Sequence, residues 1–464
     1  MWNLATRAPT FIARRCWNER HAWPFTTPSV HGEYRSPSVA QLGYHVSASV
    51  YVAYRPVKRT RENEVERGNG HPAGMSLGQS IAVTLTSASK PLRSPDTKPA
   101  RYHEHGRQES MKAARWHGRG DVRIEDVPKP EPRQGELLLR VSWCGICGTD
   151  VEEFRAGPII VPVDVPNNLT GRCAPLILGH EFVGRVAGVG PGVNGFQVDD
   201  RVAPEVVLFC GECFFCRRHE YALCQNWAAL GLMADGGLAE YAVVPAFSCA
   251  RLPPHLSDEE GALVEPTEVA VRAVRKSDMH LGDTVAVLGG GTIGLLALQV
   301  ARAAGAGAVC LIEPRARRRE LGLALGATTT FDPSQADWQQ GLQAACNGIG
   351  PDIVIECAGA PETADTALHV ARKGGCIVLV GIQPERVPFS TLELIIGEKR
   401  VVGSVQHHYD DDLPIALQLL AQGQVRVAQL ITDRVPLDRL VADGLRALAE
   451  QPEEHLKIIV SPTL

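Results

Sequence analysis

The 464-residue chain lacks any long hydrophobic run and has few cysteines for its length. A membrane-spanning helix needs roughly 18 or more consecutive apolar residues, and the best candidate, 286–301, is interrupted by glycines and a glutamine. Thirteen cysteines in a chain of this size, with no apolar secretion signal before them, do not make a disulfide scaffold. The sequence therefore predicts a soluble protein with two or three domain cores, whose cysteines are reduced thiols or metal ligands.

Charge is unevenly distributed along the chain, and the division falls at Met111. Residues 1–110 carry 15 Lys and Arg against 8 Asp and Glu, whereas residues 111–464 carry 32 against 44. The first part shows no sustained helix or strand period, so we expect a disordered leader or an over-extended start of the gene. Its arginine-rich opening is also typical of a mitochondrial transit peptide, which is the alternative to a cytoplasmic location. Its short basic stretch near residue 60 is followed by glutamates and has no aromatic platform, so no nucleic-acid partner is expected.

Four cysteines lie close together in the run CGECFFCRRHEYALC. The CxxCxxC spacing lets sulfurs converge from one turn, and a fourth thiolate completes a tetrahedral site, which is typical of structural zinc. A bacterial ferredoxin cluster would end with a shorter spacing and a proline, whereas Gln225 follows here. Disulfides or packed free thiols are the alternatives. The predicted structural zinc ligands are Cys210, Cys213, Cys216 and Cys224.

A second constellation precedes this run and consists of Cys147 in CGICGTD and the pair His180 and Glu181 in LGHEFVG. Each lies at a glycine-flanked turn, where glycine allows a tight bend. Three protein ligands leave one position for water or substrate, as in catalytic zinc sites, although a lone His or Cys is more often a packed residue. Glu265, in ALVEPTEVA, is expected as a fourth ligand, as a partner of a ligand, or as a helix N-terminal acid favoured by the dipole.

The segment DTVAVLGGGTIGLLALQVARAAGA predicts a buried strand over 284–288, a glycine-rich turn and a helix. In a GxGxxG turn the first glycine permits the bend, the second lets the backbone approach a pyrophosphate, and the third lets helix and strand pack closely. A second strand, AVCLIE, ends on Glu313, where a carboxylate accepts a hydrogen bond from a ribose hydroxyl and disfavours a 2′-phosphate. The sequence therefore predicts NAD rather than NADP, bound by Gly289, Gly291, Thr292, Ile293, Gly294 and Glu313.

The stretch after this turn alternates between strand and helix patterns. DIVIECAG and CIVLVGI are strand patterns, and helix patterns begin near residues 363 and 390, which predicts a doubly wound parallel sheet. Residues 413–422 predict an amphipathic helix that returns the chain toward the first lobe. Arginine beside the ribose-binding acid can accommodate a 2′-phosphate, but we interpret most of this group as a solvated helix face: Arg315, Arg317, Arg318 and Arg319.

With both metal motifs and the dinucleotide turn in this order, the chain resembles the zinc-dependent medium-chain alcohol dehydrogenases over residues 111–464. The likeness rests on CGICGTD, LGHEFVG, CGECFFC, DGGLAEY, LVEPTEVA, GDTVAVLGGGTIG, ECAGAPE and HLKIIVSP. It implies an α/β fold, with a GroES-like β-rich catalytic domain over 111–265, a Rossmann domain with a doubly wound parallel sheet over 266–405, and a C-terminal return over 406–464. It also implies two zinc ions per chain, bound NAD, and a homodimer or homotetramer.

The insert GPIIVPVDVPNNLTG and the run EPRARRREL are similar to the 2,3-butanediol dehydrogenase branch of that family. This likeness implies reversible NAD-linked oxidation of a small secondary alcohol or vicinal diol, with 2,3-butanediol and acetoin as the leading pair. Sorbitol, another polyol and L-threonine are alternative substrates, because one fold serves many substrates. A catalytically silent NAD-binding protein is an alternative of another class, which the intact ligand set disfavours.

In the mechanism that the resemblance implies, zinc lowers the pKa of the alcohol, Thr149 accepts its proton and passes it outward, and hydride moves to the nicotinamide. Two positions depart from the family pattern. Glu152 replaces a histidine that relays the proton in many relatives, and a carboxylate begins ionised at neutral pH. Asp199 replaces a glycine in a turn and is expected to matter only to folding.

Overall fold

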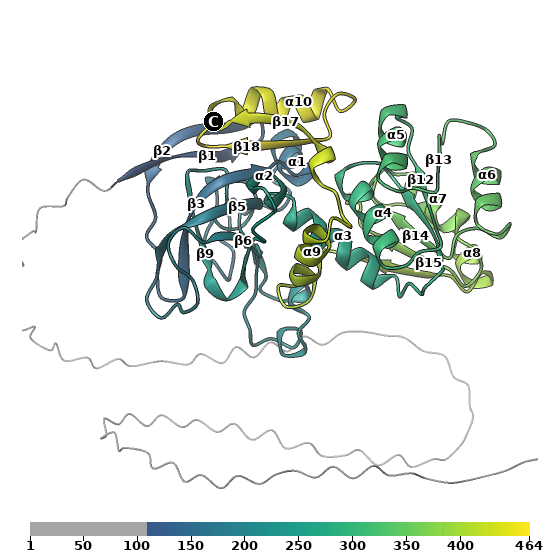
Figure 1. Cartoon of the computed structure of the whole chain (residues 1–464), viewed down its shortest axis with the longest axis horizontal. Coiled ribbons are helices and arrows are strands. Elements are labelled where there is room, and N and C mark those ends of the chain that lie inside the picture. The colour runs from purple at the N-terminus through teal and green to yellow at the C-terminus, as the bar shows by residue number, and fades with distance from the viewer. Residues whose placement is uncertain (1–108, 384) are drawn as a thin grey trace, which may run out of the picture. The chain divides into compact units, whose positions relative to one another are not determined.

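A computed structural model describes residues 109–383 and 385–464 of the chain (Figure 1). The predictions for the N-terminal leader concern residues that lie outside this described part. The strands form three main sheets, of three, seven and six strands, and a two-stranded ribbon. Among the described residues, none of the helices has both the length and the apolar character needed to cross a membrane.

The seven-stranded sheet combines strands from both ends of the described chain. β3 (Glu136–Gly145) pairs antiparallel with β5 (Glu181–Val189), β9 (Tyr241–Pro245) and β18 (Lys457–Ser461). The C-terminal segment therefore contributes a strand beside the first long strands of the chain. The remaining members of this sheet are β6 (Arg201–Pro204), β10 (Cys249–Arg251) and β17 (Ile431–Pro436).

The three-stranded sheet covers one side of the same lobe and has the order β2-β1-β4. Apolar side chains of β1 enter the core, and Trp116 is completely buried there. The indole Nε1–H of Trp116 donates to the carbonyl oxygen of Glu153 at 3.0 Å, so the polar atom of this large side chain is satisfied. The strands are β1 (Ser110–Gly118), β2 (Asp121–Pro128) and β4 (Leu176–Ile177).

The six-stranded sheet is parallel throughout, with the order β13-β12-β11-β14-β15-β16. The strand predicted over 284–288 is confirmed as β11 (Thr284–Leu288), and the doubly wound fold is confirmed. Strand order reverses between β11 and β14, and ligands of such sheets bind outside the carboxyl ends of the strands at this point. The other strands are β12 (Ala308–Ile312), β13 (Thr329–Phe331), β14 (Ile353–Glu356), β15 (Cys376–Leu379) and β16 (Arg400–Gly403).

Helices connect these strands and pack against the sheet (Figure 1). The helix expected near residue 363 is confirmed as α7, and the one after Ser390 is confirmed as α8. In chain order the helices of this part are α4 (Thr292–Ala303), α5 (Ala316–Ala324), α6 (Trp338–Ala345), α7 (Thr363–Val370) and α8 (Thr391–Ile396).

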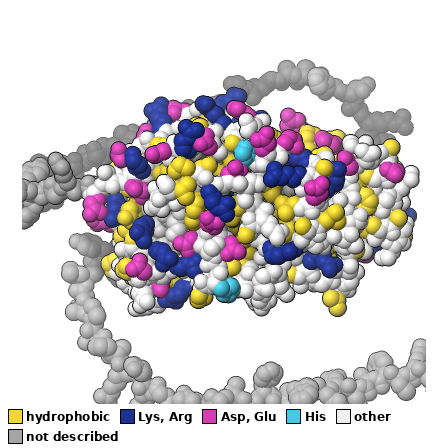
Figure 2. Space-filling model, turned by 45° about the horizontal axis from the view of Figure 1, so that its top comes forward, with side chains coloured by type: hydrophobic (Ala, Val, Ile, Leu, Met, Phe, Trp, Pro, Cys, Tyr) yellow, Lys and Arg dark blue, Asp and Glu magenta, His cyan; other side chains and the backbone are white. Residues whose placement is uncertain are grey.

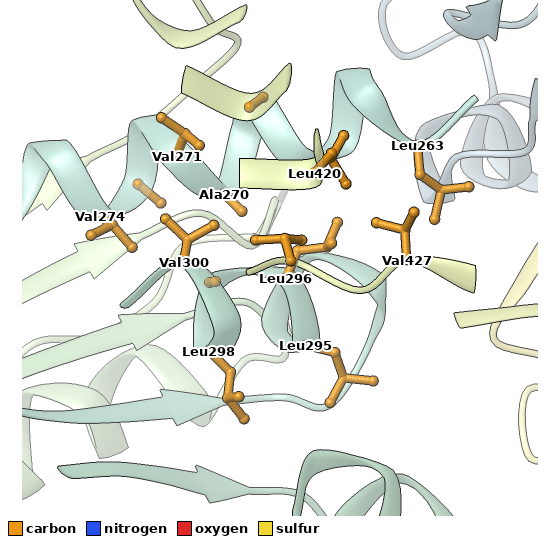
Figure 3. Close-up of a cluster of buried hydrophobic side chains, with 14 of the residues drawn as sticks. Leu263, Ala270, Val271, Val274, Leu295, Leu296, Leu298, Val300, Leu420 and Val427 are labelled. Carbon is orange, nitrogen blue, oxygen red and sulfur yellow. The ribbon is translucent and has the colours of Figure 1, made fainter. Parts of the chain in front are cut away.

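One continuous core joins three helices that are distant in sequence. Figure 3 shows Val274 of α3 (Val264–Lys276) beside Val300 of α4, with Val271 on the other side of α3 and Leu420 on α9 (Asp412–Ala421). All four side chains belong to one buried cluster. The helix predicted over 413–422 is thus confirmed as α9, and it packs on α3.

The surface carries both signs of charge. On the face drawn in Figure 2, basic and acidic side chains are interspersed. Several are paired, for example Arg439 with Asp443 at 2.7 Å and Arg434 with Glu259 at 2.7 Å. Pairs exposed in this way contribute only about 0–1 kcal/mol each to stability.

Asp199 lies in the turn between β5 and β6, as the sequence predicts. Its φ of +72° is in the left-handed region, where glycine is unstrained and aspartate is among the better-tolerated side chains. Its N–H donates to the carbonyl oxygen of Val186 at 2.8 Å, which closes the turn.

Candidate active site and metal centres

Three candidate zinc ligands meet where the end of β3 lies beside the start of β5. Cys147 caps the N-terminus of α1, residues 148–156, while Glu181 opens β5 and His180 directly precedes it. Gly179 makes the bend before them with a φ of +91°, and a Cβ at this position would overlap neighbouring side chains. One potential ligand atom from each of the three residues lies within 4.8 Å of the other two. The chain therefore brings together a thiol, an imidazole and a carboxylate, which is a donor set that suits zinc.

The carboxylate of Asp150 contacts two of the three candidate ligands, Cys147 and His180. Its Oδ2 accepts from the N–H of Cys147 at 3.0 Å, and its Oδ1 lies 3.6 Å from Nδ1 of His180. Both Asp150 and His180 are buried, and neither Oδ1 nor Nδ1 has a hydrogen-bond partner within the described residues. A metal-bound histidine usually directs its other ring nitrogen at a carboxylate, so this arrangement leaves Nε2 of His180 for the metal.

The positive charge of Lys457 offsets the negative charge of the buried carboxylate of Glu181. Its Nζ donates to Oε2 at 2.6 Å and to Oε1 at 2.9 Å, and also to the carbonyl oxygen of Ile146 at 2.9 Å. Burial alone would lower the pKa of Lys457, but the charges of Glu181 and Cys147 raise it above its ordinary value. Each carboxylate oxygen has a second lone pair, so this ion pair still leaves Glu181 able to bind a metal.

The two residues predicted to handle the substrate proton are placed differently. Thr149, in the first turn of α1, has its Oγ1 3.7 Å from Sγ of Cys147 and so borders the ligand cluster. The side chain of Glu152 is 53% exposed and pairs with Arg155 at 3.2 Å. The structure thus places Thr149 beside the ligands and turns Glu152 toward solvent.

Glu265 lies in the first turn of α3, and its Oε1 accepts from Nε2 of His407 at 2.9 Å. It is not one of the three residues whose ligand atoms converge, although the charges of His180 and Lys457 act on it. Burial would raise the pKa of Glu265, but its bond to His407 and these nearby charges lower it below the ordinary value. The residue therefore stays ionised beside the ligand cluster.

Sequence reasoning missed three residues of this site: Asp150, His407 and Lys457. Asp150 stands in the CGICGTD motif and Lys457 in the closing HLKIIVSP, so the motifs contained both, but no local pattern assigned them a role. His407 lies in no motif that we singled out. Its partners are 142 and 202 residues away in sequence.

The four-cysteine lobe has the dimensions of a tetrathiolate site. The shortest separations between its sulfurs are 3.5 Å for Cys213–Cys216 and for Cys210–Cys224, and 3.9–4.0 Å for Cys210–Cys216 and Cys213–Cys224. Zinc–sulfur bonds of about 2.3 Å in a tetrahedron require sulfurs about 3.8 Å apart, so the cradle fits zinc. The N–H groups of Cys216 and Cys210 donate to Sγ of Cys213 and Cys224, which favours the thiolates.

The glycine-rich turn is shaped for a dinucleotide. Gly289 has a φ of +99°, and a Cβ on Gly294 would overlap the carbonyl oxygen of Gly289, so both positions need glycine. A Cβ on Gly291, in contrast, would meet nothing within 4 Å. This open space lies at the N-terminus of α4, where Thr292 and Ile293 begin the helix and N–H groups favour a phosphate.

Glu313 lies at the end of β12 and is 2% exposed. Its Oε2 accepts from the N–H of Gly290 at 2.6 Å, and its Oε1 accepts from the N–H of Arg315 at 2.9 Å. The acid is therefore locked beside the glycine-rich turn. Each carboxylate oxygen has a further lone pair, so these bonds leave Glu313 able to accept others.

The interpretation of the neighbouring arginines as a solvated helix face is wrong for three of the four. Arg315 pairs with Glu453 at 2.8 Å, and Arg318 donates to the carbonyl oxygen of Pro452 at 2.6 Å. Arg319 donates to the carbonyl oxygen of Glu313 at 2.8 Å, and only Arg317 is exposed. The segment near residue 453, more than 130 positions away, binds the guanidinium groups of Arg315 and Arg318, a contact that no local pattern predicts.

Comparison with known families and proteins agrees with this geometry. The family described as alcohol dehydrogenase GroES-like domain matches residues 133–254, and the zinc-binding dehydrogenase family matches residues 292–422. The chain is 38% identical over 355 residues to the (R,R)-butanediol dehydrogenase of Bacillus subtilis (strain 168), covering 76% of this chain and 100% of the relative. It is 31% identical over 360 residues to the sorbitol dehydrogenase of the same organism, covering 77% and 99%.

Comparison with solved structures also finds a dehydrogenase of this kind. The crystal structure of 2R,3R-butanediol dehydrogenase from Bacillus subtilis superposes with a TM-score of 0.71 at 36% identity, covering 76% of this chain and 100% of that one. Residues 133–254, which the GroES-like family matches, include the three candidate ligands and the four cysteines. The chain belongs to the zinc-dependent medium-chain alcohol dehydrogenase family, whose members are oxidoreductases that act on CH–OH groups with zinc and a nicotinamide dinucleotide.

Proposed function

We propose that the chain oxidises 2,3-butanediol to acetoin with NAD, and catalyses the reverse reduction. The observation that carries this proposal is the cluster of Cys147, His180 and Glu181 in a chain that is 38% identical to an (R,R)-butanediol dehydrogenase over that relative's whole length. The sorbitol dehydrogenase likeness at 31% identity keeps a polyol as the second candidate substrate.

In this proposal Cys147, His180 and Glu181 hold the catalytic zinc, and Glu265 is a further ligand or a partner of one. Zinc supplies Lewis-acid chemistry that lowers the pKa of the alcohol. Asp150 fixes the tautomer of His180, as its 3.6 Å approach to Nδ1 supports. Lys457 keeps Glu181 ionised and in place through its two hydrogen bonds.

Thr149 is the proposed first acceptor of the alcohol proton, because its hydroxyl lies 3.7 Å from Sγ of Cys147. A hydroxyl both donates and accepts, so it can take a proton and pass one on. The exposed position of Glu152 suits it only for the last transfer to solvent, through water. We propose that role for it in place of a histidine.

We propose that Gly289, Gly291 and Gly294 cradle the pyrophosphate of NAD and that Glu313 accepts hydrogen bonds from its ribose. The nicotinamide ring supplies the hydride chemistry when the cofactor is bound. The open space at Gly291 and the locked carboxylate support this assignment. Because three of the neighbouring arginines are already engaged by the chain, they are poorly placed to receive a 2′-phosphate, which also favours NAD. Thr292 and Ile293 complete the proposed cofactor site with their N–H groups.

We propose the domain division 111–265, 266–405 and 406–464, with a structural zinc held by the four-cysteine lobe. The pairing of β17 and β18 within the seven-stranded sheet supports the assignment of the last segment to the catalytic lobe. A cytoplasmic location is proposed from the cysteine chemistry, because none of the twelve cysteines in the described residues forms a disulfide.

A homodimer or homotetramer is the proposed assembly, in which two copies pair through β16 and α8. β16 is an edge strand of the six-stranded sheet, with a neighbour on one side only among the described residues. Beside it, Leu392, Ile395 and Ile396 are 68%, 71% and 63% exposed, which is an unusual concentration of apolar surface. An edge strand flanked by apolar side chains pairs readily with a second copy. Light scattering coupled to gel filtration tests this assembly, and a monomer would contradict it.

The experiment that tests the proposed function is a panel of substrates with both cofactors. We expect NAD-dependent oxidation of 2,3-butanediol with a higher kcat/KM than for sorbitol or L-threonine, and weaker activity with NADP. A polyol or threonine that outperforms 2,3-butanediol would contradict the substrate assignment. Absence of activity with every alcohol, together with NAD binding, would support a silent NAD-binding protein.

A further inference from the structure

A second group of potential metal ligands lies next to the catalytic cluster, around the buried side chain of His407. Nδ1 of His407 is 2.7 Å from Oε2 of Glu205 and 3.1 Å from Oε2 of Glu268. On the other side of the ring, Nε2 lies 2.9 Å from Oε1 of Glu265. The ligand atoms of Glu205, Glu268 and His407 all lie within 4.8 Å of one another.

The fold delivers these side chains from three segments. Glu205 follows β6, and its second oxygen accepts from the N–H of Val207 at 2.8 Å, so its orientation is fixed. Glu265 and Glu268 are three residues apart on α3 and therefore share a helix face. His407 lies between β16 and α9, and these two elements place its ring between the glutamates.

The environment of Glu268 indicates that a cation binds at this cluster. It is completely buried, and neither of its carboxylate oxygens has a hydrogen-bond partner within the described residues. Its Oε2 nevertheless faces Nδ1 of His407 at 3.1 Å. A buried carboxylate without partners is costly unless it is neutralised or bound to a cation.

Two buried carboxylates, those of Glu205 and Glu268, face the same ring nitrogen, Nδ1 of His407. When both are ionised they carry two negative charges, and a protonated His407 leaves one of them unmatched. A divalent cation on the neutral ring matches both.

We propose that Glu205, Glu268 and Nδ1 of His407 bind a divalent transition-metal ion, a site additional to the two zinc sites of the family. The Nε2–H of His407 then donates to Glu265, which is the usual arrangement of a metal-bound histidine with a carboxylate on its far side. One imidazole and two carboxylates suit zinc or manganese, and the absence of a thiolate separates this site chemically from the Cys147 cluster.

The spacing of the ligands is compatible with a metal ion. Bonds of about 2.0–2.2 Å from zinc to nitrogen and oxygen put tetrahedral ligands roughly 3.3–3.6 Å apart. The separations from Nδ1 are 2.7 Å and 3.1 Å, so a bound ion moves the carboxylates outward by several tenths of an ångström. Three protein ligands leave a coordination position for water.

The test is a count of metal ions per chain. The full-length protein is depleted of metal with a chelator, loaded with zinc alone, freed of unbound ions, and measured by mass spectrometry with inductively coupled plasma. We expect three zinc ions per chain for the wild type, two for Glu268→Gln, two for Cys147→Ser, and one for the double variant. Glu320→Gln is the matched control, because Glu320 is an exposed acid on α5, and it should keep three.

Cobalt substitution supplies a second readout that does not depend on catalysis. The difference spectrum between wild type and Glu268→Gln should show ligand-field bands without thiolate charge-transfer bands, because oxygen and nitrogen alone bind at this site. Circular dichroism verifies that the variant is folded. A wild-type count of two, or a count of three that Glu268→Gln leaves unchanged, would overturn the proposal. So would a difference spectrum that contains thiolate bands.

Discussion

Two single substitutions in the glycine-rich turn separate its structural role from its cofactor role. In Gly294→Ala, the new Cβ would overlap the carbonyl oxygen of Gly289 and lie 3.0 Å from its carbonyl carbon. Neither atom belongs to a flexible side chain, so the backbone must shift. In Gly291→Ala, the new Cβ meets nothing within 4 Å, and the backbone φ of −72° is one that alanine adopts without strain.

The expected changes in stability follow from these contacts. Inside a helix, alanine stabilises by about 1 kcal/mol relative to glycine. Overpacking typically costs about 1–3 kcal/mol, and because this overlap is with backbone atoms we take the upper part of that range, about 2–3 kcal/mol. We therefore expect Gly294→Ala to lower the free energy of unfolding by about 1–2 kcal/mol, which is roughly 2–8 °C in Tm at about 2–4 °C per kcal/mol. For Gly291→Ala, the reduced entropy of the unfolded chain, about 0.4–1 kcal/mol, offsets the weaker N-cap, so Tm should hardly change.

The expected changes in cofactor binding differ from the changes in stability. The methyl group of Gly291→Ala occupies the space proposed for the pyrophosphate, so we expect the Kd for NAD to rise at least about tenfold, equal to about 1.4 kcal/mol. Gly294→Ala should also weaken the binding of NAD, because the substitution displaces the glycine-rich turn. Isothermal titration calorimetry measures the Kd, and differential scanning fluorimetry without cofactor measures Tm.

Either of two results would refute this reasoning. Wild-type NAD affinity in Gly291→Ala would mean that the open space does not face the pyrophosphate. An unchanged Tm in Gly294→Ala would mean that the helix and strand do not need the close approach that the structure describes.

Three further perturbations test other parts of the structure. Asp352 accepts from the N–H and hydroxyl of Thr284, both at 2.7 Å, and from Arg372 at 2.5 Å, and these partners outweigh burial and lower its pKa below 3.8. Because the pKa of Asp352 is lower in the folded than in the unfolded chain, its ionised form stabilises the fold above the unfolded-state pKa, and this stabilisation is lost on acidification. Urea unfolding should therefore show Asp352→Asn less stable than the wild type by about 2 kcal/mol at neutral pH, with the difference shrinking as the pH falls below about 3.8. An equal difference at neutral pH and below about pH 3.8 would contradict this. Glu153→Gln should speed proteolysis within residues 157–171, because the carboxylate accepts from the N–H groups of Ile159 and Val161 at 3.1 Å, and unchanged cleavage would argue against that anchor. Cys213→Ser should lose one zinc per chain and expose residues 210–224 to protease before the rest unfolds, whereas an unchanged zinc count would disprove the tetrathiolate site.

The dinucleotide fold and the metal motifs were predictable from the sequence because their information is local. The GxGxxG turn, the strand before it and the helix after it occupy adjacent residues, and β11 and α4 lie where the pattern predicts them. The four cysteines likewise converge within fifteen residues. Backbone geometry and short-range spacing suffice for features of this kind.

The surroundings of the site were not predictable, because they depend on contacts between distant segments. Lys457 reaches Glu181 across 276 positions, and His407 reaches Glu205 across 202. The sequence could not show that Arg315 and Arg318 are bound, because the segment that binds them lies far along the chain. Local periodicity reports burial on one element, and it does not report which remote element supplies the partner.

The most direct test of the proposed active site is the Cys147→Ser variant, measured for turnover, NAD affinity and zinc content together. Removing one of the three converging ligands should reduce kcat with 2,3-butanediol by at least about a hundredfold, because several kcal/mol of charge stabilisation depend on the metal. The Kd for NAD should stay within about twofold of the wild type, since the glycine-rich turn is untouched, and one zinc per chain should be lost. Retained turnover in a variant that has lost this zinc would contradict the account.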